Sequence, residues 1–557
     1  MRNRLFQLLC GFYLGIGVCA GGDPVLHKQI DQQIESSFAK WKVTPSKMAT
    51  DADLVRRAHL DLIGRIPDAA TTREYLNDTR PDKWPRLVER LITSEDFARH
   101  LAVVLDVMLM ERRPDKYVTT DEWRDYLAKS FNTNKPLDLL AREILGEDGV
   151  KPETRPAAKF FLDRAVEKDT LVRDVSRLFL GVDLQCAQCH DHPKISDYLH
   201  EHFHGLSVFF AGSKTFKQSD GKMVLQEMAM REVEFASVFK PEQTRKTGPR
   251  LPGGSVLDIP VFEKGKEYVE KPSSKVRAVP KFSLRQHLAE DLTSPETPAF
   301  ARNMANRLWA LMMGRGLVHP LDMHHSANPS SHPELLDLLA GQLTALNYDT
   351  KAFLRELVLS KTYQRSSELP DGVKADAVPP ESFAVANMKG LSPEQMFESL
   401  LQATESGNVL QKQIEETLKE DEEAYGKLSA DQDKLAKARI AERNATIKKF
   451  VEVFGGTPGN PDEGFQASLP QALFLANNEI VAGWVEPQDG NLSARLLKLK
   501  EASRITEVAG LAILSRPPAP EEIAMAKEHF SKRTDQRAAV LEYMWSLLAS
   551  AEFRLNH

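Results

Sequence analysis

The sequence predicts a mainly α-helical fold, with a helical N-terminal domain, a small β-containing insert or linker, and a helical C-terminal domain. Apolar residues recur at three- and four-residue spacing from about residue 30 to 179, and again after residue 281. Between these regions the chain alternates polar and apolar residues and is rich in Gly and Pro. A chain of 557 residues also exceeds the usual size of one domain.

Residues 1–20 have the pattern of a secretory signal peptide. Arg2 and Arg4 precede a short apolar run, and Val18 and Ala20 occupy the −3 and −1 positions of a cleavage site. The run is shorter than the roughly 20 residues that a membrane-spanning helix needs. We therefore expect an exported protein, periplasmic or at the cell surface, with no transmembrane span in the mature chain.

The N-terminal helical domain is predicted to span residues 25–212. Its apolar side chains recur along several short stretches, and the segment 146–156 interrupts the pattern. The last stretch, 171–180, leads into a cysteine motif. The periodic positions include Val55, His59, Leu60 and Ile63, then Leu87, Leu91 and Ile92, then Trp123, Leu127 and Phe131.

The insert is predicted to span residues 213–280. Residues 232–235 alternate in the manner of a strand, and Gly248-Pro249 and the segment 252–254 favour turns. This change of character makes the insert the best candidate for a domain boundary.

The C-terminal helical domain is predicted to span residues 281–557. An apolar stripe runs from Ala301 to Met312, and Gly314 supplies a stop signal. Ser331 with Glu334, and Ser392 with Gln395, have capping-box spacing, and Pro393 suits a first helical position. A charged extension at about 408–450 is interpreted as a solvated helical hairpin in preference to a docking surface.

Composition excludes some function classes. A net charge of −6 and a pI near 6.2 give no basic surface for nucleic acid. The sequence has no phosphate-binding glycine loop, nucleophile elbow or metalloprotease histidine pair. Hydrolase assignments therefore lack a basis in the sequence, and enzymatic activity is left open.

The cysteines are the most informative residues. Cys10 and Cys19 would leave with the signal peptide, so the mature chain keeps Cys186 and Cys189. With His190 they form Cys186-Ala187-Gln188-Cys189-His190, the pattern of covalent haem attachment. In such sites two thiols add to the haem vinyl groups and the following histidine ligates iron. The pattern predicts haem c, with Cys186 and Cys189 as anchors and His190 as the proximal ligand.

Other uses of the same atoms remain open. Five of the 15 histidines fall between residues 190 and 204, and a metal site holding zinc or iron would use His190, His192 and His204 beside the thiols. His192 and His204 are also candidates for the distal haem ligand, as are the methionines at 223, 228 and 230. Cys186 and Cys189 alternatively form a local disulfide. Farther along, His324, His325 and His332 with nearby aspartates are interpreted as helix caps and loop residues, with a second metal site as the alternative.

Several stretches in the first half resemble the planctomycete cytochrome-c-like domain of unknown function. That family is named for its haem-attachment-like motif, so the resemblance implies haem at Cys186, Cys189 and His190. After Pro193, the Phe-Asp-Lys-Trp that is common in the family is replaced by Lys-Ile-Ser-Asp. The stretches that carry the resemblance are 57–67, 91–94, 179–182 and 186–193.

The second half resembles the planctomycete-specific domain that habitually follows the first. The stretches that carry this resemblance are Asn306-Arg307-Leu308-Trp309, 314–318, 331–337 and Ser360-Lys361-Thr362-Tyr363-Gln364.

Together these observations predict an exported c-type haem-binding protein for redox chemistry or electron transfer. Its partner would be a redox protein or a cell-surface protein of unknown identity. The alternative is a cell-surface structural or interaction protein whose Cys/His motif holds zinc or a local disulfide.

Overall fold

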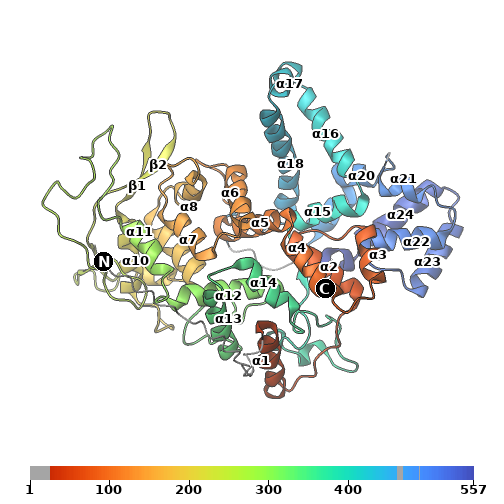
Figure 1. Ribbon diagram of the computed structural model, residues 1–557, viewed down its shortest axis with the longest axis horizontal. Helices are drawn as coiled ribbons and strands as arrows, with labels where there is room; N and C mark the ends of the chain where they lie inside the picture. The colour runs from red at the N-terminus through yellow and green to blue at the C-terminus, as the bar shows by residue number, and fades with distance from the viewer. Residues whose placement is uncertain (1–24, 461–467, 489) are drawn as a thin grey trace, which may run out of the picture.

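The computed structural model describes residues 25–460, 468–488 and 490–557 (Figure 1). The predicted signal peptide, residues 1–20, therefore lies outside the described residues. Helices dominate, and the described strands form three two-stranded sheets. The predicted mainly α fold class is confirmed.

The N-terminal segment is a succession of short helices, as the periodicity predicts. A 3₁₀ helix, η1 (Arg155–Ala158), precedes α8. A π-helical segment, η2 (Ser176–Leu180), extends α9, and a second 3₁₀ helix, η3 (Gln185–Gln188), follows it. The α-helices are α1 (Leu26–Trp41), α2 (Asp51–Ile63), α3 (Ala69–Asn77), α4 (Lys83–Ile92), α5 (Glu95–Met110), α6 (Thr120–Asn132), α7 (Leu137–Gly146), α8 (Lys159–Leu162), α9 (Lys168–Val175) and α10 (His200–Ala211).

The insert contains two antiparallel hairpins. Strand β1 (Ser213–Lys217) pairs with β2 (Met223–Glu227), with Ser213 opposite Glu227. Strand β3 (Val233–Phe235) pairs with β4 (Arg245–Thr247), with Val233 opposite Thr247. The prediction of strands in this region, including one at 232–235, is confirmed.

The C-terminal segment returns to helices. Strand β5 (Lys389–Gly390) pairs with β6 (Leu555–Asn556), which lies at the end of the chain. This pairing brings the end of the chain beside α2 (Figure 1). The short helices are η4 (Ala375–Ala377), η5 (Pro380–Ser382) and the π-helical η6 (Gly510–Leu514). The α-helices are α11 (Leu284–Leu292), α12 (Pro298–Met313), α13 (Pro333–Ala345), α14 (Thr350–Leu359), α15 (Pro393–Thr404), α16 (Gly407–Lys419), α17 (Glu422–Ser429), α18 (Gln432–Phe454), α19 (Leu469–Asn477), α20 (Glu479–Val485), α21 (Leu492–Leu496), α22 (Ala502–Ala509), α23 (Pro520–Ser531), α24 (Gln536–Leu548) and α25 (Ala551–Arg554).

Three of the four terminus signals in this segment are confirmed, including Pro393 at the first position of α15. Helix α12 ends at Gly314, which adopts the left-handed conformation, and Ser392 forms a capping box with Gln395 ahead of α15. The capping box predicted at Ser331 is wrong. Pro333 fixes the first position of α13, so His332 is the N-cap residue and its side chain makes no capping bond.

The charged extension is a helical hairpin that projects from the body of the protein (Figure 1). Its arms are α16 and α18, joined by α17, which buries none of its side chains. An ion pair between Glu415 and Arg439 connects the arms. The prediction of a solvated hairpin is confirmed.

Two hydrophobic cores organise the rest. The first collects buried side chains from Leu26 to Phe383, so α11 to α14 pack with the N-terminal helices. The second runs from Leu391 to Phe553 and also takes Leu60 and Ile66. The predicted boundary at residue 280 thus marks a change in the character of the sequence, whereas the two hydrophobic cores divide near residue 385.

Helix α2 lies between the cores. Val55, Ala58 and Leu62 pack into the first core, whereas Leu60 packs into the second. Every residue from Leu54 to Leu62 is buried, including the charged ones. A helix buried on all sides must pair its polar groups internally.

Among the described residues, no helix is both long enough and apolar enough to cross a membrane.

Candidate functional site

The cysteine motif lies in a tight turn at the end of a long helical segment. Gly181 ends that segment with a φ of 74°. The turn η3 then holds Cys186, and Cys189 continues it with helical dihedrals. Because side chains three apart eclipse each other in a 3₁₀ helix, the two cysteines project to the same side. The spacing argument from the sequence therefore holds, with a 3₁₀ turn in place of an α-helical one.

Both thiols are free and exposed. The disulfide of the alternative interpretation does not join them in this structure. Exposure leaves each sulfur accessible to an incoming group, which is what either covalent attachment or metal binding requires.

His190 is half-buried beside the thiols, with one ring nitrogen occupied. Its Nδ1 lies 2.6 Å from the carbonyl oxygen of Asp191. Because a carbonyl only accepts, Nδ1 carries the proton and the Nε2 lone pair stays available. Metal-bound histidines commonly have this arrangement, since the carbonyl fixes both tautomer and ring orientation. The ring also lies 4.9 Å from that of Phe239.

His192 is held differently. Its Nδ1 accepts hydrogen bonds from the backbone N–H groups of Lys194, at 3.1 Å, and Ile195, at 2.9 Å. A neutral ring whose Nδ1 accepts carries its proton on Nε2, so neither nitrogen has a free lone pair. His192 thus shapes the turn that follows the motif.

His204 reaches the motif through α10. Its Nε2 lies 2.9 Å from Nε2 of His200, one helical turn away, and 3.3 Å from the carbonyl oxygen of Gln188. Gln188 is one of the two residues between the cysteines. The imidazole ring of His204 stacks on the ring of Phe235 in the insert, with 4.5 Å between the ring centroids. Burial, and then neighbouring His200, lower the pKa of His204 to about 4, so His204 is neutral at pH 7.

These three histidines do not converge. His190 is bonded to a carbonyl, His192 to two amides, and His204 to a second histidine. Within the described ranges, no group of three or more His, Cys, Asp or Glu side chains is arranged to hold a metal ion. Sequence reasoning grouped them because they are close in the chain, but the turn at 192–198 separates them.

The insert covers one side of the motif. The backbone N–H of Val238 donates to the carbonyl oxygen of Cys189 at 3.1 Å. Val238 and Phe239 are 58% and 75% exposed, which is unusual for large apolar side chains beside reactive groups. The thiols therefore border an exposed apolar surface that the insert supplies.

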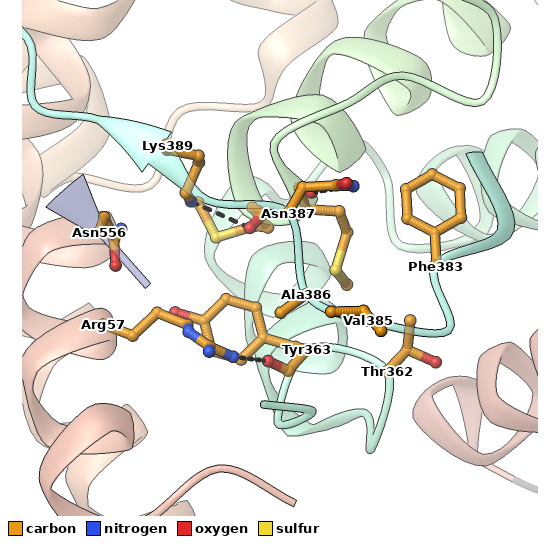
Figure 2. Close-up of a pocket in the computed structure, with 11 residues that line it drawn as sticks. Arg57, Thr362, Tyr363, Phe383, Val385, Ala386, Asn387, Lys389 and Asn556 are labelled. Carbon is orange, nitrogen blue, oxygen red and sulfur yellow. Dashed lines mark hydrogen bonds between the residues drawn. The ribbon is translucent and has the colours of Figure 1, made fainter. Parts of the chain in front are cut away.

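A second polar cluster, which the sequence did not predict, lies between the two halves of the chain. Asp61 accepts hydrogen bonds from Tyr363 Oη at 2.8 Å, from Asn556 Nδ2 at 2.7 Å and from Lys389 Nζ. Burial lowers the pKa of Lys389, and the negative charge of Asp61 opposes this change. Burial also raises the pKa of Tyr363 well above 10, and Asp61 raises it further. Figure 2 shows Arg57, Asn556 and Lys389 approaching Tyr363 from different elements.

Two family models match the chain. The first, PSCyt2, described as a protein of unknown function (DUF1549), covers residues 29–215. The second, PSD1, described as a protein of unknown function (DUF1553), covers residues 284–530. The chain belongs to this two-domain PSCyt2–PSD1 family. None of the curated proteins and none of the solved structures matches it.

The predicted resemblance is thereby confirmed, and the polar cluster joins the two domains. Asp61 and Arg57 belong to the PSCyt2 region, whereas Tyr363 and Lys389 belong to the PSD1 region. Arg57 donates to the carbonyl oxygens of Tyr363 and Arg365. The stretches that suggested each family separately are thus hydrogen-bonded to each other.

A cavity of about 20 Å³ lies within this cluster (Figure 2). Arg57 and Asn556 line this cavity, and within the described part of the chain Arg57 Nη2 and Asn556 Oδ1 are buried without a hydrogen-bond partner. Such a volume holds about one water molecule. Because Asp61 accepts hydrogen bonds from Tyr363, Lys389 and Asn556, this cluster is a structural joint.

A second joint links the PSD1 region to the helix before the cysteine motif. Asp322 pairs with both Arg177 and Arg307, and Asn303 Nδ2 donates to the carbonyl oxygen of Leu178 at 2.8 Å. His332 is the N-cap residue of α13 but makes no side-chain capping bond, and its Nε2 lies 2.9 Å from Ser37 Oγ. Asp322 and His332 therefore contribute to packing, which differs from the helix-capping role that the preferred interpretation gave to His332.

Proposed function

We propose that the PSCyt2 domain carries haem c on Cys186 and Cys189, with His190 as the proximal ligand, in an exported redox or electron-transfer protein. The observation that supports this best is local. Two free, exposed thiols three residues apart flank the turn, and the adjacent His190 keeps its Nε2 lone pair because Nδ1 is bonded to a carbonyl.

The chemistry of attachment is balanced without further reagents. Each S–H adds across one vinyl C=C bond of haem, with sulfur bonding to one carbon and hydrogen to the other. Haem would supply an iron centre that gains and loses single electrons. The chain would contribute the anchors, an oriented imidazole and the apolar side chains Val238 and Phe239 beside them. No second axial ligand is assigned, because His192 and His204 have other partners.

A second candidate function is a cell-surface structural or interaction protein in which the motif holds zinc or iron, or forms a disulfide. The close pair of His200 and His204 favours a metal, since both Nε2 atoms lie within 3.3 Å of the Gln188 carbonyl oxygen, between the cysteines. Two thiolates and two imidazoles would complete a tetrahedral site if the turn rearranged to bring the thiols to this pair. The exposed Phe239 would then serve a protein partner.

The deciding experiment is to export the full chain in a host with haem-attachment machinery, then record its visible spectrum and intact mass. The proposal expects a Soret band and a mass increase of one haem that survive denaturation. Both should be lost in the C186A/C189A variant and kept in H202A, a change in the same histidine-rich segment. A colourless protein with the mass of the polypeptide alone overturns haem attachment. Metal analysis and thiol counting then distinguish zinc from a disulfide.

A further inference from the structure

A cavity of about 380 Å³ lies between α5 and α12, away from the cysteine motif. Its walls are mainly apolar, with Val104 and Met108 from α5 and Leu308 and Leu311 from α12. The volume is in the range of about 300–1,000 Å³ that small-molecule sites occupy. No residue of the motif or of the Asp61 cluster lines it, so its role is separate from both.

Two polar atoms at this cavity have no hydrogen-bond partner among the residues that the structure describes. Arg315 Nε and Thr350 Oγ1 are each buried without a hydrogen bond, and both residues line the cavity. Buried polar atoms in folded proteins are nearly always bonded, so two unpartnered ones at one cavity indicate a missing ligand or solvent. Arg315 forms a loose ion pair, with Glu381 Oε2 3.7 Å from its Nη2.

The charge of the lining favours an anion. Arg307 and Arg315 both line the cavity, and no Asp or Glu does. Arg307 is already bonded to Asp322 and to the carbonyl oxygen of Arg177. Arg315 is therefore the cation with hydrogen-bonding capacity left. Burial also lowers the pKa of His319, so this neighbour adds a neutral ring to the wall.

We propose that this cavity binds an amphiphile with a carboxylate head and an apolar chain, and that Arg315 pairs with the carboxylate. The planar guanidinium matches the geometry of a carboxylate, and pairing satisfies the donors that the protein leaves open. The apolar chain lies against the side chains of α5 and α12, where burial removes it from water. Thr350 Oγ1 bonds to water or to a polar atom of the ligand. The inference does not depend on haem binding.

The test is calorimetric titration of the full chain, purified without detergent and stripped of bound lipid, with three ten-carbon probes. Decanoate should bind in a saturable 1:1 manner, decanol at least tenfold more weakly, and decyltrimethylammonium without detectable heat. R315Q should weaken decanoate binding at least tenfold and leave decanol unchanged. The matched control is R302Q on α12, because Arg302 pairs with Asp337 and does not line the cavity.

A second variant tests the location. L308W fills the cavity and should abolish binding of decanoate and decanol alike, with folding checked by circular dichroism. If L308W does not fold, the probe series and R315Q decide alone. Decanoate binding no tighter than decanol, undiminished binding in R315Q, or full binding in a folded L308W would each overturn the proposal.

Discussion

The hydroxyl of Tyr363 donates a hydrogen bond of 2.8 Å to Asp61 Oδ2, across a sequence separation of 302 residues. Asp61 lies in the PSCyt2 region and Tyr363 in the PSD1 region. The same carboxylate binds Lys389 and Asn556, and α2, which carries it, packs into both hydrophobic cores. Neither domain therefore completes its own interior, and we expect the two to fold as one unit.

Tyr363→Phe should lower the free energy of unfolding by about 1–3 kcal/mol, because it leaves a buried carboxylate oxygen without its donor. Urea unfolding followed by circular dichroism measures the change. Tyr425→Phe is the matched control, since it removes a hydroxyl that bonds Glu415 on the projecting hairpin, and it should stay within about 0.5 kcal/mol of the parent. Equal stability of the two variants would contradict the assigned role of Tyr363.

Lys389→Met should cost about 3–5 kcal/mol, because it strands the buried charge of Asp61. Lys389 also donates to the carbonyl oxygens of Leu311 and Met312, each at 3.0 Å. The double variant D61N/K389M should cost less than the sum of the single changes, since both charges are then removed. A double-mutant cycle measures this coupling, and strict additivity would show that the two side chains do not act as a pair.

Gly181→Ala should be more destabilising than Gly372→Ala, although both glycines have a φ of 74°. A Cβ at Gly181 would lie 2.7 Å from His324 Cδ2 and 2.8 Å from Asn303 Oδ1, whereas a Cβ at Gly372 meets nothing within 4 Å. Backbone strain of about 1–2 kcal/mol is common to both, so the difference reports the close packing. Thermal unfolding of the two variants gives that difference, and indistinguishable melting temperatures would rule out the tight contact.

Acidification should destabilise the protein in part through His59. The residue is 5% exposed, and its burial lowers its pKa from 6.5 to about 4. The unfolded chain therefore binds the proton first, and stability that is complete above pH 6.5 declines as the pH falls towards 4. The loss is up to about 3 kcal/mol by linkage.

His59→Asn keeps a donor near the Val55 carbonyl oxygen but does not titrate in this range. Its unfolding free energy should fall less steeply between pH 6.5 and 4 than that of the parent chain. Urea titrations at several pH values measure both slopes, and parallel slopes would exclude His59 as a contributor.

If haem is attached as proposed, His190→Ala should keep the covalent mass increase but change the Soret band, because the thiols remain while the proximal ligand is lost. His192→Ala should leave the spectrum as it is, since its Nδ1 is bonded to two backbone amides. Intact mass and visible spectra of both variants test this. The reverse pattern would assign the iron ligand to His192.

Local signals account for what sequence reasoning predicted well. The spacing of apolar residues identified the helices, the left-handed Gly314 ended α12, and the composition of 408–450 identified a solvated hairpin. The one failed cap, at Ser331, also has a local cause, because Pro333 moved the helix start by one residue. Cys186, Cys189 and His190 were found because haem attachment requires only neighbours in the chain.

The sequence by itself determined the helices, the insert and the cysteine motif, since each depends on residues within a few positions of one another. The tertiary structure decided which helices share a core, why 281–383 packs with the N-terminal half, and how Asp61 meets Tyr363 and Lys389. It also decided that His204 joins His200 at Gln188 while His192 does not. The physical reason is that burial forces charged and polar groups to find partners wherever the fold brings them, and no local pattern records those distant pairings.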